Sequence, residues 1–550
     1  MKKFTLCVLI LAVLASALVV FSAGQDTSRT TQASTSSAYG DVNGDGKVSL
    51  SDASLILKYI AKFEVEIDTK LADVTGNGRV NLTDVSRILK RVAKWNISLN
   101  PAETTVYDIA EDGFAVADFE KKEFKILHYG ETATDFHDRY IWPDSYNGDV
   151  IDEAVKERNS TVEDRYNVKI TAEECGPAGE AAKRQQAGQC DFEVIYEWGV
   201  RMRNLAVEGF LYDLNELTYA NLDRSYWVPS AVESLTVSGR LYMATNMVSM
   251  NSLAWADILY FNKNLMDKLN IMYPYDLVKE GNWTYDALIP MVMAAEEDVN
   301  RDGVMDNRDQ YGGISGNFLL RGVCSEPLVK DNGDGTYEFI PYTENLAAQY
   351  SKYSAKLRSI EELTKDEILE GVDTSAFPSK YVAARYLSFG EDHTLFLEGN
   401  LEMSNEFVDM QSDYGILPMP VVNPGDDYVS TFDYIAPLFA VPLQVDDPDM
   451  TAIVFDYMAW ESEELLLPAY YETTIKTKRM QDTRDYDTID IVRNSATCSW
   501  IDAYMFDSDT VQFRDRVILN GTFASMYKRY AKRCQDEIDE LTERILSLES

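Results

Sequence analysis

The feature that most constrains this chain of 550 residues is a repeat near its beginning. The segment GDVNGDGKVSLSDASLILKYIAKF starts at Gly40, and ADVTGNGRVNLTDVSRILKRVAKW starts 32 residues later at Ala72. A repeat at a fixed spacing has to be identified before any other assignment, because each copy is one structural unit. The copies align without a gap, and each predicts a polar loop followed by a helix.

Both loops carry oxygen-bearing residues at alternate positions, with Gly46 or Gly78 at the sharp turn. Calcium takes about six to eight hard oxygens, and a loop with this spacing aims them at one point. The ligand positions are Asp41, Asn43, Asp45, Lys47, Ser49 and Asp52 in the first copy, and Asp73, Thr75, Asn77, Arg79, Asn81 and Asp84 in the second, with Lys47 and Arg79 offering backbone carbonyls. The sequence therefore predicts two calcium sites. The second carries less charge, because Asn77 stands where an aspartate is usual.

An ordinary EF-hand closes its loop with glutamate and has a helix on each side. Here aspartate closes both loops and one helix follows each, so residues 40–97 resemble a type I dockerin. Dockerins dock secreted proteins onto cohesin domains of a scaffoldin. The resemblance implies a small all-α fold that binds cohesin through loop positions 10 and 11 and the helices, in two orientations because the copies are nearly identical. In this chain those residues are Leu50, Ser51, Lys58, Leu82, Thr83 and Lys90.

Residues 1–24 predict a secretion signal, in which two lysines precede an apolar run and small residues follow it. Cys7 lies near the start of that run, so no cysteine stands at the cleavage point and no lipid anchor is expected. Residues 25–39 are rich in Ser and Thr and predict a flexible linker. We expect a second linker over 98–120, with packing of the apolar residues of 106–119 as the alternative, and a globular region over 121–550, long enough for two lobes.

The formal charge of −40 falls on the large region, because the repeat is close to charge-balanced. Nucleic acids and anionic membranes attract basic patches, so this charge argues against both as partners. Beyond the signal there are five cysteines, an odd and sparse set that excludes a disulfide scaffold. For Cys175 and Cys190, a disulfide between them and two buried thiols remain as alternatives.

Strands and helices alternate at the start of the large region. Strands are expected at 124–129, 168–171 and 192–196, and helices at 150–166 and 203–207. This alternation predicts an α/β fold with largely parallel, doubly wound sheets.

A series of longer motifs carries a second resemblance. In order they are IDEAVKERNSTVEDRYNVKI from Ile151, LYFNK from Leu259, GNWTYDAL from Gly281, DVNRDGVMDNRDQYGG from Asp298, GILPMP from Gly415 and FAVPLQVDDPDMTAIVFDYMAWES from Phe439. With this order and spacing, residues 121–550 are similar to extracellular solute-binding proteins of bacterial ABC transporters, in the carbohydrate-binding group. The resemblance implies a type II periplasmic-binding-protein-like fold, with two lobes closing on a solute that is delivered to a permease.

Sugar pockets combine aromatic rings, which stack on the faces of the sugar, with polar groups for its hydroxyls. Such residues are expected where strands end at a cleft. The candidates are Glu197, Trp198, Tyr242, Trp255, Asp433 and Tyr434, and for each of them packing in the core is the alternative. By contrast, Trp283 is expected to be structural, with Thr284 capping the helix that follows.

A third loop of calcium type lies inside the large region. Its ligand positions are Asp298, Asn300, Asp302, Val304 (backbone carbonyl), Asp306 and Asp309, with Gly303 at the turn. A solvated acidic turn is the alternative. Asp331–Gly335, DNGDG, predicts instead a hairpin turn between two strands.

No motif of a known catalytic centre (GxSxG, HExxH or P-loop) is present, and the three histidines share no motif, so we do not expect an enzyme. The leading hypothesis is a secreted oligosaccharide-binding protein that a dockerin tethers to a scaffoldin or cell surface in place of a lipid. The alternatives are a non-transport carbohydrate-binding component of a cellulosome-like complex and, less favoured, a polysaccharide-degrading enzyme.

Overall fold

The structure is a computed structural model of the whole chain. It describes residues 39–63, 65–74, 80, 82–92, 99, 107–129, 140–142, 150–303, 305, 309–315, 329–333, 335–340, 356–359, 363–365, 374–377, 379–407, 409–432, 436–471, 482–498, 500–505, 508 and 523–548. The predicted secretion signal and nearly all of the first linker lie outside these residues. The chain divides into two compact units, Met1–Thr104 and Thr105–Ser550.

The smaller unit is built from helices, as the sequence predicts. They are α2 (Leu50–Ile60), α3 (Thr69–Ala72) and α4 (Leu82–Val92). The two long helices start 32 residues apart and pack against each other. Equivalent residues of the two copies are buried in pairs, Ala53 with Val85 and Ile56 with Ile88. The short α3 was not predicted from the sequence.

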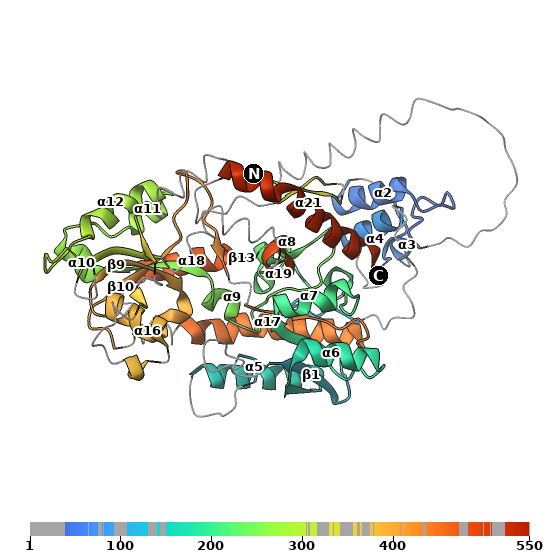
Figure 1. Cartoon of the computed structure of the whole chain (residues 1–550). Coiled ribbons are helices and arrows are strands. Elements are labelled where there is room, and N and C mark those ends of the chain that lie inside the picture. Colours follow the sequence, from blue (N-terminus) through green and yellow to red (C-terminus); the bar gives the residue numbers. More distant parts are fainter. Residues whose placement is uncertain are drawn as a thin grey trace, which may run out of the picture. The chain divides into compact units, whose positions relative to one another are not determined.

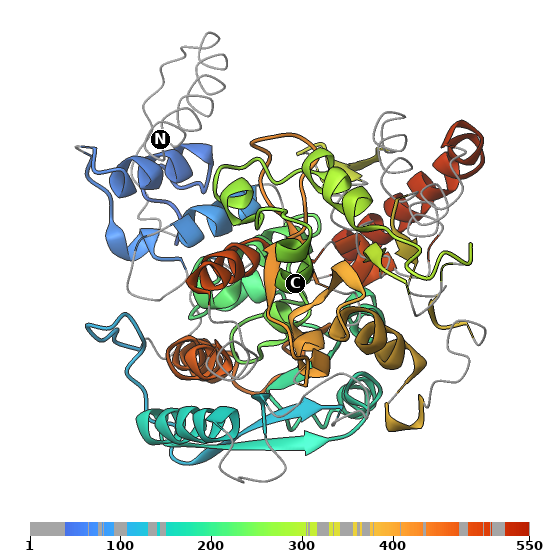
Figure 2. The ribbon, with the colours of Figure 1, turned by 90° about the vertical axis from the view of Figure 1, so that its left-hand side faces the viewer.

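The two largest sheets among the described residues of the larger unit each define a lobe. The sheet of the first lobe has the order β12-β3-β1-β2. Its strands are β1 (Lys122–His128), β2 (Val168–Glu174), β3 (Val194–Trp198) and β12 (Pro437–Ala440), and its helices are α5 (Val150–Tyr166), α6 (Pro177–Gln186), α7 (Gly199–Val207) and α17 (Pro448–Tyr471). The long helices α5 and α17 lie side by side in both views (Figures 1 and 2).

The second lobe has a five-stranded sheet in the order β10-β4-β9-β5-β8. Its strands are β4 (Asp257–Asn262), β5 (Tyr311–Ser315), β8 (Arg358–Ser359), β9 (Thr394–Asn400) and β10 (Tyr414–Pro418). The elements around it are α10 (Lys263–Lys268), α11 (Tyr275–Lys279), α12 (Tyr285–Ala295), η4 (Thr374–Ala376), α16 (Lys380–Arg385), η5 (Tyr386–Gly390), η6 (Leu401–Phe407) and α18 (Thr483–Asn494). Figure 1 shows most of this group on its left side.

The prediction of largely parallel sheets is only partly right. Strand β1 is parallel to both β2 and β3, and β5 is parallel to β8 and β9. However, β12 is antiparallel to β3, and β4 is antiparallel to β9 and β10. Each sheet is therefore mixed, because strands that arrive from distant parts of the sequence pair in the opposite sense.

Shorter elements connect or cover the lobes. They are η2 (Leu214–Glu216), η3 (Ser225–Trp227), α8 (Pro229–Leu235), α9 (Asn251–Ala254), β6 (Val329–Asp331), β7 (Tyr337–Phe339), β11 (Ser430–Thr431), β13 (Ala496–Thr497), α19 (Trp500–Met505) and α21 (Phe523–Ser547). The β6–β7 pair is the hairpin predicted around DNGDG. The predicted cap is also confirmed, since Thr284 accepts a hydrogen bond from the N–H of Ala287 at the start of α12.

The second predicted linker is wrong over its last part. The larger unit begins at Thr105, and the segment 107–120 packs on α5 and α17. The ring of Phe114 meets that of Tyr457 with centroids 5.0 Å apart, and Asp112 pairs with Arg165 at 2.8 Å. Phe114, Ala115 and Phe119 of this segment are buried, so it belongs to the lobe.

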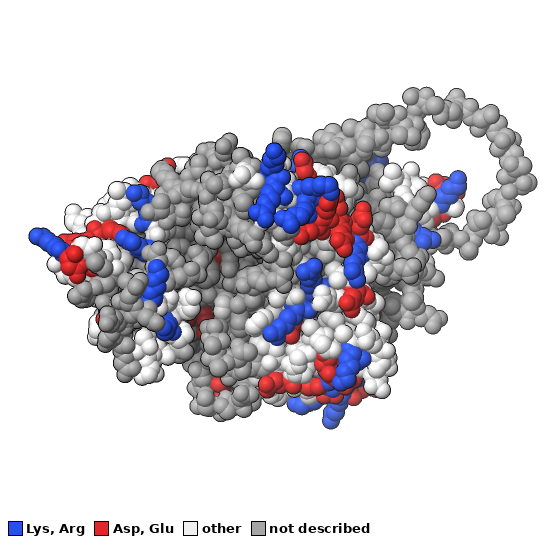
Figure 3. All heavy atoms as spheres, in the orientation of Figure 1, with Lys and Arg blue, Asp and Glu red and all other residues white. Residues whose placement is uncertain are grey.

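Within the described residues, no helix combines the length and apolar character needed to cross a bilayer. Basic and acidic side chains are segregated over α21 on the face in Figure 3, with Lys528–Arg533 basic and Asp536–Glu543 largely acidic. Cys175 and Cys190 are free thiols, which answers the question that the sequence left open, while Cys324 lies outside the described residues.

Candidate functional site

The first loop of the smaller unit is organised around two buried carboxylates, Asp41 and Asp52. Asp52 accepts hydrogen bonds from the backbone N–H groups of Val42, Asn43 and Ser49 at 2.9–3.1 Å. Asp41 accepts from the N–H of Gly46 at 2.9 Å, where the backbone turns with φ +83°. Two buried carboxylates with amide and hydroxyl oxygens beside them form a hard-oxygen donor set, which fits calcium.

The carboxylates of the first loop accept hydrogen bonds from the backbone of the same loop, and they do not point at a common centre. Among the described residues, no three His, Cys, Asp or Glu side chains gather into a group that could hold a metal. The hydrogen bonds of the first loop explain this, because each carboxylate oxygen is turned toward an N–H.

The second loop is described only at its ends. Asp73 and the buried Asp84 are described, whereas Thr75, Asn77, Arg79 and Asn81 lie outside the described residues. Among the expected cohesin contacts, Leu50 is 65% exposed, Ser51 is exposed and Lys58 is partly exposed. The backbone of Leu82, Thr83 and Lys90 is helical, but their side chains lie outside the described part.

The loop at Asp298 repeats three hydrogen bonds of the first loop, those accepted by loop positions 1, 3 and 12. Asp298 accepts from the N–H of Gly303 at 2.9 Å, as Asp41 does from Gly46. Asn300 accepts from Asp302 at 2.8 Å, and Asp309 accepts from the N–H of Val299 at 2.9 Å. Asp309 is fully buried, and the ligand positions Val304 and Asp306 lie outside the described residues.

In the larger unit, Glu197 and Trp198 end strand β3, next to the end of the parallel strand β1. The backbone N–H of Trp198 donates to the Glu197 carboxylate at 2.9 Å, and Arg201 pairs with the same carboxylate oxygen at 3.4 Å. The Arg201 guanidinium also lies over the Trp198 ring, 4.1 Å from its centroid. Tyr129, which follows β1, meets the Trp198 ring edge-on at 6.1 Å.

Contacts within the first lobe hold these side chains in place. Glu197 is 1% exposed, and burial raises its pKa although the N–H of Trp198 and the cation of Arg201 oppose the shift. Trp198 and Tyr129 remain partly exposed. The exposed guanidinium of Arg201 can bind hydroxyl groups, and the partly exposed rings of Trp198 and Tyr129 can stack on an apolar face, while the buried Glu197 carboxylate holds Arg201 in place.

Two of the other sequence candidates, Tyr242 and Trp255, are buried. Tyr242 is 3% exposed, and its hydroxyl accepts a hydrogen bond from Arg240 at 3.0 Å within the first lobe. Trp255 is buried directly after α9, before strand β4. Asp433 and Tyr434 lie outside the described residues. Burial of Tyr242 and Trp255 is what the alternative of core packing predicts.

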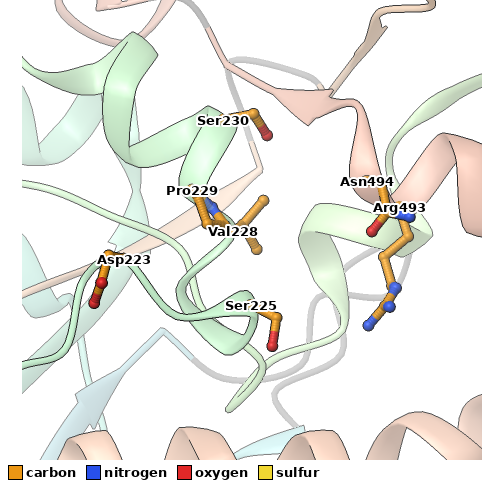
Figure 4. A pocket seen from close by; sticks show the side chains of 7 residues that line it. All are labelled: Asp223, Ser225, Val228, Pro229, Ser230, Arg493 and Asn494. Atoms are coloured by element: carbon orange, nitrogen blue, oxygen red, sulfur yellow. The ribbon is translucent and has the colours of Figure 1, made fainter. Parts of the chain in front are cut away.

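Sequence reasoning missed a polar pocket of 360 Å³ between the lobes (Figure 4). It is lined by Asp223, Ser225, Val228, Pro229, Ser230, Arg493 and Asn494. Glu463 of α17 joins its two sides, since it accepts from the Ser225 hydroxyl at 2.8 Å and pairs with Arg493 of α18 at 3.2 Å. No local motif marks these residues. Arg201, also missed, lies four residues after Glu197, the spacing that brings side chains together on a helix.

Comparison with known proteins assigns the smaller unit. Residues 39–93 match the family model described as Dockerin type I domain. The chain therefore carries a type I dockerin domain, in the segment where the repeat predicts one. Dockerin domains bind calcium and dock onto cohesins, so calcium binding and cohesin docking are assigned to this segment. No curated protein matches the chain.

Solved structures similar to the chain are all distant from it. A sugar transporter protein from Rhizobium etli in an open conformation has 13% identity and a TM-score of 0.46, covering 77% of this chain and 99% of its own. An ABC substrate-binding protein from Listeria monocytogenes in complex with cycloalternan has 13% identity and a TM-score of 0.43, with the same coverage. A de novo designed esterase has 14% identity and a TM-score of 0.47, covering 77% of this chain and all of its own. Likenesses at this level do not identify a function.

Proposed function

We propose that the chain is a secreted oligosaccharide-binding protein, held at a scaffoldin or cell surface by its dockerin domain. The observation that carries the binding role is the cluster of Glu197, Trp198 and Arg201 at the carboxyl edge of the first sheet. Its guanidinium, which the buried carboxylate holds in place, matches sugar hydroxyls, and its partly exposed ring matches the C–H face of a sugar. The ordered motifs of residues 121–550 support the same class of protein.

The dockerin supplies the location. The predicted signal lacks a cysteine at its cleavage point, so a receptor of this kind needs another means of staying near a permease and near enzymes that release oligosaccharides. Docking onto a cohesin provides it. The exposed Leu50 and Ser51, with Lys58, form the described part of the contact surface that the dockerin resemblance implies.

Three calcium ions are proposed, two in the dockerin and one in the loop at Asp298. The third rests on the ligand spacing and on the hydrogen bonds that this loop shares with the first dockerin loop. Its expected role is to fix the connection between α12 and β5, away from the solute.

Titration calorimetry with a panel of plant-derived oligosaccharides tests the binding role. We expect tight binding without turnover, and a loss of affinity of about ten-fold or more in Trp198→Ala. Tyr381→Ala, an exposed aromatic on α16, is the matched control and should bind as the wild type does. Affinity for insoluble polymer alone would favour the non-transport carbohydrate-binding component, and new reducing ends would favour the enzyme.

The tether is tested by replacing Asp41 and Asp52 together with alanine and measuring retention at the cell surface. Loss of retention is expected, because both carboxylates organise the first loop. Lys47→Ala is the control, since Lys47 offers its backbone carbonyl and its side chain is exposed. Unchanged retention of the double variant would refute the tether.

A further inference from the structure

Helix α21 carries its exposed charges in two separate blocks on one face. The basic block consists of Lys528, Arg529, Lys532 and Arg533, and the acidic block consists of Asp536, Asp539, Glu540 and Glu543. With about 100° of rotation per residue, all eight side chains leave the helix within an arc of about 140°. Figure 3 shows the basic and the acidic side chains beside each other on the surface.

The opposite face fixes the helix on the larger unit. Its buried residues are Tyr530, Cys534, Ile538, Leu541 and Ile545. Arg544 donates to the carbonyl of Val207 in α7 at 3.0 Å. The Gln535 amide donates to the carbonyl of Tyr337 and accepts from the N–H of Phe339, both at 2.8 Å. Because these contacts set the rotation of the helix, the two charged blocks face solvent.

This order of charges is unfavourable within the helix itself. Residues four apart are neighbours on a helix surface, and like charges at that spacing destabilise the helix. Four pairs of this kind occur, Lys528 with Lys532, Arg529 with Arg533, Asp536 with Glu540 and Asp539 with Glu543. Interleaved charges would avoid all four, so the stability of the helix does not explain the two blocks.

A second copy of the same helix complements both blocks at once. In an antiparallel pair whose two-fold axis passes between Lys532 and Asp536, each of these residues faces the other one in the second copy. Further from the axis, Lys528 then faces Glu540 of the second copy. A two-fold axis repeats each contact, so the basic block of either chain meets the acidic block of the other.

We propose that α21 is a self-association surface, through which two copies of this chain pair antiparallel by charge. The two blocks extend about 24 Å along the helix, which makes a small interface of the weak class. Exposed ion pairs are screened by salt, and in the Lys532–Asp536 pair the side chains are 86% and 58% exposed. This association goes beyond the proposed binding role and does not depend on the solute.

Sedimentation equilibrium of the full chain at low ionic strength, from about 1 to 200 µM, tests the pairing with two charge-reversal variants. Lys528→Glu with Arg529→Glu makes the face largely acidic, and Asp539→Lys with Glu540→Lys makes it largely basic. Each variant alone should lose about ten-fold or more in association constant. An equimolar mixture of the two should associate about as the wild type does, because each reversed block meets its complement.

Both variants exchange like-charged neighbours on the helix, at the pairs named above, for opposite ones, so α21 is expected to stay folded. Glu157→Lys with Asp164→Lys, two exposed acidic positions on α5, matches the charge change of the second variant. This control should associate as the wild type does. The proposal is overturned by a wild type that stays monomeric over the whole range, by association that either reversal leaves unchanged, or by a mixture that does not associate.

Discussion

Buried carboxylates in this protein differ in the hydrogen-bond donors and charges that surround them. Asp52 of the dockerin accepts hydrogen bonds from three backbone N–H groups and one hydroxyl, all of which stabilise its charge. Glu193, directly before β3, accepts a backbone bond from the N–H of Lys125 and faces the negative charges of Glu123 and Asp191. Burial, which is the largest cause, raises the pKa of Glu193 to about 7.

We predict that Glu193 makes the larger unit less stable as the pH rises. Its ordinary pKa is 4.5, so between pH 4.5 and 7 the folded state holds a proton that the unfolded state has released. Stability from this group is therefore complete below pH 4.5 and falls as the pH rises to about 7. Glu193→Gln lacks the titration and keeps the bond from Lys125. In urea unfolding, the free energy of unfolding of Glu193→Gln relative to that of the wild type should therefore increase by about 1–3 kcal/mol from pH 4.5 to pH 8.

Glu157→Gln, at an exposed position of α5, serves as the control and should follow the wild type at both pH values. A constant difference between Glu193→Gln and the wild type across this range would contradict the assignment.

At the scale of elements, the segment 107–120 shows how a peptide next to a linker can belong to the core. Phe114 is buried among the rings of Tyr226, Tyr457 and Trp460. We predict that Phe114→Ala destabilises the larger unit by about 3–5 kcal/mol, because it leaves a cavity in an aromatic cluster. Thermal unfolding would measure this loss.

Val116→Ala, two residues further and 58% exposed, should cost less than about 0.5 kcal/mol. Equal losses in the two variants would mean that the segment is loosely attached and that its aromatic contacts do not stabilise the lobe.

Local signals predicted the elements well, whereas partners distant in sequence could not be predicted. Thr284 caps α12 and DNGDG forms a hairpin, because both depend on neighbouring residues alone. Glu197 could be named as a candidate since it follows an apolar strand. Tyr242 could not be recognised as buried, because Arg240, which holds its hydroxyl, is fixed in turn by the carbonyl of Leu548 at the far end of the chain. The antiparallel partners of β3 and β4 are distant for the same reason.

At the scale of the whole molecule, the dockerin and the larger unit have separate roles, and each contains a loop of calcium type. The dockerin determines where the protein is held, and the larger unit is proposed to bind solute there. Because the loops at Asp41 and Asp298 have the same ligand spacing and share three backbone hydrogen bonds, calcium is expected to stabilise both units. Calcium would then control location and binding together.

We therefore predict that calcium removal destabilises the two units independently. A ligand at about 100 times its Kd stabilises the folded state by about 2.7 kcal/mol, so chelation should lower the unfolding temperature of the larger unit by a few degrees and that of the much smaller dockerin by about 10–20 °C. Calorimetric scans with and without chelator measure this. Asp298→Asn with Asp309→Asn should remove the response of the larger unit alone, since asparagine keeps the acceptor for Val299 but loses the charge. Asp41→Asn with Asp52→Asn should weaken that of the dockerin alone, because the second dockerin loop keeps its ligands. Asp331→Asn, in the acidic hairpin turn, should leave both responses intact. If chelator does not change the unfolding temperature of the larger unit in the wild type, the loop at Asp298 is a solvated acidic turn and only the dockerin binds calcium.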